Sequence, residues 1–352
     1  MKKPAEWAGP DWVTVGPLVV KRSVVMASPQ LRCTAPRSLG ILVPDLLRYP
    51  ASPPRLDDLL FFDLETTGLS TGPGTLAFLA AFGRLTGEDT LKVDQYLLLD
   101  YPGEPGFLEA VLGEFAESSL LISYNGKSFD SQLLNTRCIM NGIRPPDYYQ
   151  ADLLHPCRQL WKRVLPSCSQ GAIETGILGL DRTGDIPGSM APDIWFSFLK
   201  TGEPSELLKV CDHNARDIAG LGGILGALCT IAEDPSGGGE RFRCDPENLA
   251  LRWHRAIRRH GEEAFGAGTM KTGDALLQAA VELGYRRAAY CHYRTRAIEA
   301  EWKRRDPASA LGYVEAFLAL PDIQDSIGDS IEDEMFHRRE RLLEKLKQGW
   351  MP

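Results

Sequence analysis

The stretch FFDLETTGLS, at residues 61–70, places two carboxylates one residue apart at the end of an apolar run. The letters LLFFDLE predict a strand that is covered on both faces. Alternate residues of a strand point to the same side, so Asp63 and Glu65 share a face at its C-terminal end, where ligands of open α/β sheets bind. Buried like charges repel. The pair is therefore either solvated, as a lone D-x-E usually is, or neutralised by a cation between the side chains.

The segments that follow this strand indicate an α/β fold. TLAFLAAFGRL and LKVDQYLLLD come next as two strands with short turns between them, which predicts an antiparallel meander. LLISYNG and YYQADLLH are further strands that alternate with helical patterns. The run SELLKVCDHNARDIAGLGGILGALCTIA predicts a long helix with Ser205 as its N-cap. Together these segments predict a mixed sheet with helices on its faces.

Three regions are expected along the chain. Residues 1–55 form a lead-in with a short β-like pair and a proline-rich passage, and residues 56–235 form the α/β domain. The segment EDPSGGGE, at 233–240, is interpreted as a linker. Residues 241–352 hold only helical patterns, and the junctions ELGYRRAAY and ALGYVEAFLALP are similar to tetratricopeptide units. Because the period is irregular, a small helical bundle is an equal alternative.

The composition is that of a soluble globular protein, with 43% apolar and 24% charged residues among 352. No apolar run reaches the length of a membrane span, and no apolar stretch follows the N-terminal lysines, so neither a membrane partner nor a secretory signal is expected. The eight cysteines form no C-x-x-C pair, which argues against a disulfide framework or a zinc site. We therefore expect reduced thiols and a cytoplasmic location.

The net charge of −8 is distributed unevenly. Residues 56–235 hold 12 Lys and Arg against 25 Asp and Glu, a net charge of −13. Residues 241–305 hold 14 basic against 8 acidic residues, a net charge of +6. An acidic domain binds phosphates if metal ions neutralise its site, while a basic neighbouring region supplies attraction. The distribution is thus compatible with a polyanionic partner.

Two further motifs add to the D-x-E pair. Asp130 lies at a strand-to-helix junction in YNGKSFDSQLL, after Asn125 and Phe129. His213 and Asp217 lie four residues apart on the predicted long helix, hence on one face. Each motif alone is weak, because an Asp on a helix is usually a solvated charge and a single His is more often structural than catalytic.

Taken together, the motifs supply four carboxylates on three elements that a mixed sheet can bring together. Such oxygen-rich clusters suit Mg²⁺ or Mn²⁺. Two ions about 3.5–4 Å apart can orient a water and stabilise the leaving oxygen in phosphodiester cleavage. A histidine one turn from the last carboxylate can take a proton from that water. No arrangement fits a Ser or Cys triad, and GPGT is too short for a phosphate-cradling loop.

The order D-x-E (Asp63, Glu65), N-x-x-x-F-D (ending at Asp130) and H-x-x-x-D (His213, Asp217) resembles the DEDD, or DnaQ-like, 3′–5′ exonucleases of the ribonuclease H-like superfamily. ETTGL after the first Asp is a characteristic continuation. The chain is most similar to the YprB-type branch, in which this domain precedes tetratricopeptide-like helices. The segments DLLHPCRQLWKRVLPSCSQGAIE and LGLDRTGDIPG resemble the connecting region of that branch.

The resemblance implies a role for each matching residue. Four carboxylates would ligate two divalent metals, and His213 would be the base that activates or positions the water; the four are Asp63, Glu65, Asp130 and Asp217. Residues lining the 3′-terminal nucleotide would be Thr66, Thr67, Gly68 and Leu69. One departure is that His213 precedes the last Asp by four residues, the spacing usual for a tyrosine, while histidine usually stands five before. A water-positioning or structural role for His213 therefore stays open.

Several residues are weaker candidates for substrate contact. Asn125, Lys127 and Phe129 adjoin Asp130, and Lys127 could touch a phosphate, although a solvated lysine is at least as common. Asp152 is either a supporting acid or a strand-end residue making local hydrogen bonds, and His155 and Arg158 follow it. In the helical region, RWHRAIRRH (252–260) and YRRAAYCHYRTR (285–296) mix Arg with aromatic residues, a composition that suits nucleic acid but also solvated helix faces.

The resemblance implies a metal-dependent 3′–5′ exonuclease with a two-metal mechanism, acting on a single-stranded 3′ end of RNA or DNA. The helical region would guide the substrate or bind a protein partner. The alternative from another class is a catalytically inactive ribonuclease H-like protein that binds nucleic acid or acts as a scaffold. Retention of all four acids favours the enzyme.

Overall fold

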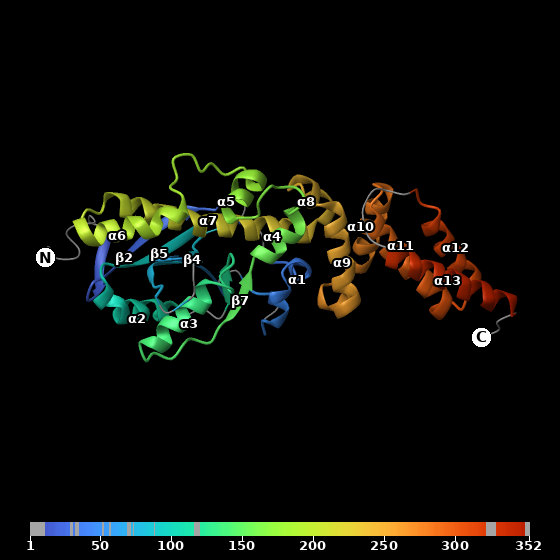
Figure 1. Cartoon of the computed structure of the whole chain (residues 1–352), viewed down its shortest axis with the longest axis horizontal. Coiled ribbons are helices and arrows are strands. Elements are labelled where there is room, and N and C mark those ends of the chain that lie inside the picture. The colour runs from blue at the N-terminus through green and yellow to red at the C-terminus, as the bar shows by residue number, and fades with distance from the viewer. Residues whose placement is uncertain are drawn as a thin grey trace. The chain divides into compact units, whose positions relative to one another are not determined.

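The structure is a computed structural model, and it describes residues 11–28, 31, 35–50, 53–55, 58–68, 72, 74–87, 89–115, 120–321 and 329–348. Its contacts divide the chain into two compact units, Met1–Arg243 and Cys244–Pro352. The first unit holds a mixed sheet with helices on its faces, and the second is helical (Figure 1).

A seven-stranded sheet forms the centre of the first unit, in the order β1-β2-β5-β4-β3-β6-β7. The strands are β1 (Trp12–Gly16), β2 (Val19–Ala27), β3 (Leu59–Thr66), β4 (Ala77–Leu85), β5 (Thr90–Leu98), β6 (Leu120–Ser123) and β7 (Tyr149–Asp152). β3, β4 and β5 form the predicted antiparallel meander, and β6 and β7 extend the sheet in parallel with β3. β2 pairs with β5 along its whole length, so part of the predicted lead-in belongs to this sheet.

Helices cover both faces of the sheet (Figure 1). The longest, α7 (Ser205–Glu233), crosses β2 to β5 on one face, while α2 (Glu104–Phe115) and α3 (Asp130–Met140) lie on the other. The remaining helical elements of this unit are α1 (Leu39–Leu42), η2 (Pro44–Arg48), η4 (Tyr101–Gly103), α4 (Leu154–Trp161), α5 (Gln170–Ile173), η5 (Glu174–Leu178), η6 (Gly188–Met190), α6 (Ala191–Thr201) and α8 (Pro235–Arg241).

Small residues let α7 approach the sheet closely. A Cβ atom at Gly83 of β4 would lie 2.4 Å from Cγ2 of Ile218 on the helix. On the helix side, a Cβ atom at Gly222 would lie 2.7 Å from Oγ of Ser28. Contacts this short are forbidden to real side chains, so the two glycines permit a helix-to-sheet distance that alanine would not. The packing therefore fixes the position and rotation of α7.

Two sequence expectations about this helix region are wrong. Ser205 is the first helical residue and provides no side-chain cap, because the residue before it is Pro204 in a helical conformation. The glycine-rich segment expected to be a linker forms α8, which Asp234 caps by accepting a hydrogen bond from the Gly237 N–H at 3.0 Å. A Cβ at Gly238 would lie 2.9 Å from Cα of Ile231, so this glycine serves close packing instead of flexibility.

Within the described residues, one helix is long and apolar enough to span a membrane by length and composition, and it is α7. Charged residues interrupt its apolar run, so no span was expected from the sequence. Of its most apolar 18-residue window, 78% is buried inside the protein, as is usual for a core helix.

The second unit contains consecutive helices that pack on one another: α9 (Pro246–His260), η7 (Glu262–Ala264), α10 (Thr269–Glu282), α11 (Arg286–Ile298), η8 (Glu299–Lys303), α12 (Pro307–Leu318) and α13 (Asp329–Lys347). Apolar side chains such as Val314, Phe317 and Met335 form its core. Within that core, the fully buried Glu301 accepts hydrogen bonds from Arg341 and Lys345, both at 2.6 Å. The all-helical prediction is confirmed, and likeness to tetratricopeptide units stays a prediction.

Candidate metal centre

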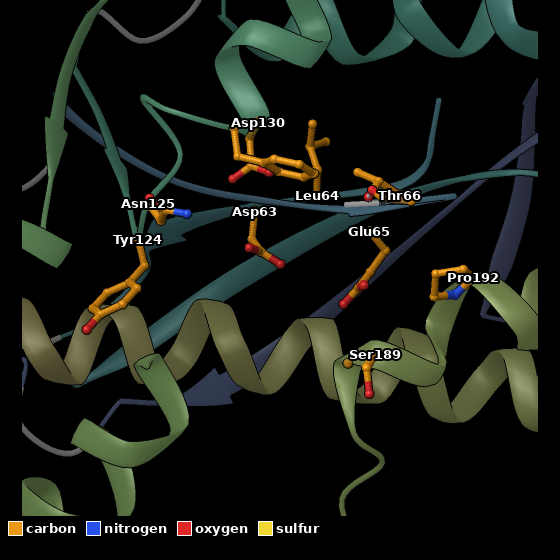
Figure 2. A pocket seen from close by; sticks show the side chains of 12 residues that line it. Asp63, Leu64, Glu65, Thr66, Tyr124, Asn125, Asp130, Ser189 and Pro192 are labelled. Carbon is orange, nitrogen blue, oxygen red and sulfur yellow. Dashed lines mark hydrogen bonds between the residues drawn. The ribbon is translucent and has the colours of Figure 1, made fainter. Parts of the chain in front are cut away.

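The four predicted carboxylates come from three elements that meet at one end of β3. Asp63 and Glu65 point from the strand toward α7, and Asp130 stands at the start of α3 (Figure 2). Asp217 lies on α7 with His213 one turn before it. A cavity of about 310 Å³ opens here, and Asp63, Glu65 and Asp130 line it.

Three of the predicted site residues lie within reach of a single ion. One ligand atom each from Glu65, His213 and Asp217 lie within 4.8 Å of one another. Nε2 of His213 is 3.4 Å from Oδ2 of Asp217, so the four-residue spacing does place both side chains on one face of α7. Asp63 and Asp130 are not part of this group of three. Glu65 connects the two sets, because it lines the same cavity as Asp63 and Asp130, whereas His213 and Asp217 are not among the lining residues.

Burial is the main reason that the pKa values of Asp63 and Glu65 lie well above their ordinary range. Negative charge on Asp130 and Asp217 raises the pKa of both side chains further. Because burial and like charge act in the same direction, the protein alone disfavours the ionised form of this pair. A bound cation would reverse that preference.

The other two carboxylates differ in their neighbours. Burial, with a contribution from the charge of Asp152, raises the pKa of Asp130 to about 7. Burial also raises the pKa of Asp217, although the charges of His213 and Arg182 oppose the shift. Asp217 is therefore the one proposed ligand that already has a cationic partner in the described structure.

A chain of polar side chains holds Asp63 in place. Nδ2 of the fully buried Asn214 on α7 donates a hydrogen bond to Oδ2 of Asp63 at 2.7 Å. Gln95 of β5 in turn donates to Oδ1 of Asn214 at 2.8 Å and accepts from Nε of Arg22 at 2.6 Å. This relay links three strands and the helix, so Asp63 is held by the core of the domain. Neither Asn214 nor Gln95 was predicted from the sequence as a site residue.

A tight loop after β6 positions Asp130. Asn125 adopts a left-handed backbone with φ of 63°, a conformation that asparagine tolerates better than most residues. Its N–H donates to Oδ1 of Asp152 at 2.8 Å, and the N–H of Lys127 donates to Oδ2 at 3.1 Å. Asp152 is 2% exposed, so its carboxylate supports this loop from inside. Asp152 thus makes the local hydrogen bonds that the sequence analysis favoured for it.

The loop between η5 and η6 brings two unforeseen charged residues against α7. Nη2 of Arg182 lies 2.5 Å from Oδ1 of Asp217, and Nη1 lies 2.6 Å from Oδ2 of Asp185. Arg182 also pairs with the fully buried Glu174. The guanidinium therefore joins three acids and restrains the carboxylate of Asp217.

Asp185 contacts the ring of His213 at Nδ1. Its Oδ2 lies 2.9 Å from Nδ1 of His213, close enough for an ion pair, although the ring N–H is not aligned for a hydrogen bond. Burial would raise the pKa of Asp185, but His213 and Arg182 lower it more, so the carboxylate stays ionised. The ionised carboxylate of Asp185 lies at Nδ1 of His213, and the other ring nitrogen, Nε2, faces Asp217.

The remaining predicted contacts are spread around the cavity. Thr66, Gly68, Asn125 and Phe129 line it. Thr67 and Lys127 are not among its lining residues. Thr67 instead accepts a hydrogen bond from the Leu76 N–H, and Nζ of Lys127 lies 2.6 Å from Oδ1 of Asp45. Leu69 falls outside the described residues.

The basic segments of the second unit lie on α9 and α11. Trp253 of α9 is 1% exposed, and its indole N–H donates to the backbone oxygen of Thr269. Tyr290 of α11 donates a hydrogen bond to Glu334. These two aromatic side chains are therefore used inside the helical unit.

The donor set fits a hard divalent cation. Carboxylate oxygens are the ligands that Mg²⁺ and Mn²⁺ prefer. The raised pKa values of Asp63, Glu65 and Asp130 indicate that these acids lack sufficient positive charge around them. The same three side chains line one cavity, where an ion would supply that charge.

A comparison against known protein families agrees with the fold. Residues 60–229 match the profile of a family described as the RNase_H superfamily. Residues 60–229 form an RNase H-like domain. The matched range begins in β3 and ends in α7, so it contains all four carboxylates and His213.

A similar protein is known from Bacillus subtilis (strain 168), where it is called uncharacterized protein YprB. It is 39% identical to this chain over 168 residues. The match covers 47% of this chain and 40% of YprB. The likeness therefore concerns a region about as long as the RNase H-like domain and leaves more than half of YprB unmatched.

Proposed function

We propose that this protein is a metal-dependent nuclease that hydrolyses phosphodiester bonds as a 3′–5′ exonuclease of the DEDD type. The observation that carries the proposal is the clustering of Asp63, Glu65, Asp130 and Asp217 around one end of β3, with His213 beside them. Acids that are buried together without enough neutralising charge are costly, and a cation-dependent activity gives a reason to keep them. The RNase H-like domain supports the same class of reaction.

In this proposal the four carboxylates hold two Mg²⁺ or Mn²⁺ ions. When bound, the ions supply charge stabilisation for the phosphoryl and leaving oxygens. Nε2 of His213 accepts the proton of the attacking water, while Asp185 at Nδ1 stabilises the protonated ring. Thr66, Gly68 and Phe129 line the cavity and would position the terminal nucleotide.

An alternative is a catalytically inactive RNase H-like protein that binds nucleic acid or acts as a scaffold. The observation that favours it is the pairing of Arg182 with Asp217, which provides a cation for one carboxylate without any metal. Two features weigh against this alternative. Arg182 contacts neither Asp63, Glu65 nor Asp130 in the ion pairs of the described chain, and all three of those acids keep raised pKa values.

The proposed substrate is a single-stranded 3′ end of RNA or DNA, and the helical unit is proposed to guide it or to bind a protein partner. The proposal places the protein in the cytoplasm without a membrane partner. The seven described cysteines are free thiols, which is compatible with a reducing compartment.

The proposal is tested by incubating 5′-labelled RNA and DNA, single- and double-stranded, with the full chain and Mg²⁺ or Mn²⁺. A ladder of products that shortens from the 3′ end is expected, and a circular single strand should resist cleavage. Asp63→Ala and Asp217→Ala should abolish the ladder. Intact oligonucleotides with wild-type protein, or equal digestion by these variants, would contradict the nuclease and leave the binding alternative.

Asp181→Ala is a matched control for the acidic substitutions. Asp181 is exposed and lies in the same loop as Arg182 and Asp185, and its carboxylate accepts a hydrogen bond from the Thr183 N–H. The Asp181→Ala substitution removes one negative charge, as the test variants do, but at a position outside the acidic cluster. Its digestion rate should match that of the wild-type protein.

A further inference from the structure

Two adjoining hollows lead away from the acidic cavity. The cavity shares Tyr124 and Asn125 with a second hollow of about 380 Å³. That hollow shares Arg158, Ser167 and Cys168 with a third of about 210 Å³. Because neighbouring hollows share their walls, together they form one surface groove that runs from the carboxylates to helix α4. We call it the α4 groove.

Tyr124 stands where the groove leaves the acidic cavity. Figure 2 shows its ring directed away from Asp63, beyond Asn125. Its hydroxyl donates a hydrogen bond to the backbone oxygen of Cys168 at 2.5 Å, which holds the ring between the two hollows. A fixed aromatic face can stack any nucleobase, because every base has a π-face.

Two cations border the far end of the groove. Arg158 lies on α4, and Lys162 follows one turn later on the same face. Both side chains line the third hollow, and both are exposed. Two positive charges one turn apart therefore face the solvent along one wall.

These cations stand out because most others in this acidic region are paired. All twelve Lys and Arg of residues 56–235 belong to the described chain. Eight of them form ion pairs with acids: Arg84, Lys92, Lys127, Arg137, Arg144, Arg182, Lys209 and Arg216. Arg163 also has a polar, ionic or ring contact, so it is not counted as unpaired. Among these described residues only Arg158, Lys162 and Lys200 have no acidic partner, and two of the three border the α4 groove.

We propose that the α4 groove binds the backbone of a single-stranded nucleic acid upstream of the nucleotide held at the acidic cavity. Arg158 and Lys162 contact successive phosphates, and Tyr124 stacks a base between those phosphates and the carboxylates. The region carries a net charge of −13, so a polyanion needs local cations to approach it. This inference rests on the proposed function, and it assigns a path for the strand that the motif residues do not define.

The inference is tested by binding and salt dependence. An Asp63→Asn background prevents cleavage, so that binding is measured alone. Fluorescence anisotropy then measures the affinity for a labelled single strand of about 10 nucleotides, a length within the range of about 4–16 nucleotides that single-strand-binding domains cover. Arg158→Glu with Lys162→Glu should lower this affinity about tenfold or more near physiological salt. The slope of log K against log salt should become shallower by about 1.4, because each phosphate contact on a single strand contributes about 0.7.

Length dependence separates the groove from the cavity. A labelled dinucleotide occupies the cavity without reaching α4, so the double variant should bind it as the parent does. Lys200→Glu, the matched control, changes the charge of the third unpaired cation, which lies at the end of α6 outside the groove. It should leave affinity and salt slope for both ligands within about twofold. Tyr124→Leu should weaken binding of the longer strand about fivefold or more, while Tyr124→Phe keeps the ring and should not.

The proposal that the α4 groove binds the strand would be wrong if the parent and the double variant bound the longer strand with equal affinity and equal salt slope. The same result with retained Mn²⁺-dependent digestion by the wild-type chain would leave the proposed nuclease standing. Groove-dependent binding without digestion would instead support the strand path and contradict the nuclease. The two proposals therefore fail in different experiments.

Discussion

The acidic site at β3 and α7 differs from a second charged cluster on the same sheet. That cluster, here called the paired network, spans β2, β4, β5 and α2 and consists of Lys21, Arg84, Lys92, Asp94, Tyr96 and Glu114. Glu114 is 7% exposed and Asp130 of the acidic site is 6% exposed, so the two residues expose similar fractions of their surface. Their pKa values nevertheless shift in opposite directions.

The difference lies in the neighbours. Burial would raise the pKa of Glu114, but hydrogen bonds from Tyr96 and Arg84 and the charge of Lys21 hold it below the ordinary value. Arg84 lies 2.5 Å from Glu114, and Lys21 lies 3.3 Å from it. Asp130 has another acid, Asp152, as its main charged neighbour. The sign of the neighbouring charges therefore separates the two clusters, and burial among like charges makes the acidic site the candidate functional site.

The largest expected effect concerns cleavage. Glu65→Gln keeps the shape of the side chain and removes one charge from the acidic site, so cleavage by the Mn²⁺-loaded protein should fall about 10³-fold. Glu114→Gln removes the same charge from the paired network and should leave the rate per folded molecule unchanged. Single-turnover digestion of a labelled single strand measures both. Equal losses in the two variants would erase the distinction between the clusters.

Stability should respond in the opposite sense. Breaking a buried pair leaves an uncompensated charge, so Glu114→Gln should destabilise the protein by about 3 kcal/mol. Asp63→Asn removes one of several repelling charges and keeps a group that can accept from Asn214, so it should stabilise the metal-free protein by about 1 kcal/mol. Urea unfolding in EDTA provides the comparison. A loss of stability in Asp63→Asn would show that its charge is already compensated.

The pH dependence of the metal-free protein should also separate the clusters. A carboxyl whose folded pKa is raised holds its proton after the unfolded chain has lost it, so stability falls as pH rises. For Asp130 this window runs from the ordinary value of 3.8 to about 7. Asp94 and Glu114 have lowered pKa values, so their contribution is lost only as pH falls below the ordinary range.

Thermal unfolding in EDTA should therefore show a melting temperature that declines as pH rises from the ordinary value of 3.8 to about 7. Saturating Mg²⁺ or Mn²⁺ should remove most of that decline, because the ion binds the ionised acids. Asp130→Asn should flatten the EDTA profile, and Asp181→Asn should leave it unchanged. A profile that rises over this interval, or metal that acts equally at both ends of it, would contradict the electrostatic account.

A smaller effect is expected from Asp185, which acts through His213. Asp185→Asn should lower kcat about tenfold with little change in KM, because it weakens the support of the ring and leaves the cavity intact. The metal-induced rise in melting temperature should persist. Asp185→Glu should recover part of kcat, and Asp181→Asn should have no effect. A change in KM alone would assign Asp185 to substrate binding.

Local sequence patterns predicted the backbone of the acidic site well. Alternation along β3 places Asp63 and Glu65 on one side, and a four-residue spacing places His213 and Asp217 on one face of α7. The meander of β3 to β5 and the helical second unit also follow from local periodicity. These features depend on repeats of two and 3.6 residues, which any single segment carries by itself.

The supporting residues were missed because their contacts are not local. Arg182 and Asp185 lie in a loop without periodicity, and they reach Asp217 and His213 only when that loop folds back on α7. The available signal was the charged run LDRTGD, at residues 180–185, ahead of the predicted long helix. Gly238 was misjudged for a related reason, since glycine serves both flexible linkers and close packing, and sequence alone does not distinguish these uses.

The close contact between Gly83 and Ile218 has a consequence for how this domain can tolerate insertions. A helix locked onto the sheet beside Asp217 keeps its rotation, so one residue inserted between His213 and Asp217 would turn the histidine by about 100° away from the acid. Insertions in the loop around Asp181 would lengthen a surface connection without turning α7. We therefore expect natural and engineered length variation to fall in that loop. The length of α7 between His213 and Asp217 should stay constant, because it sets the relative orientation of these two side chains.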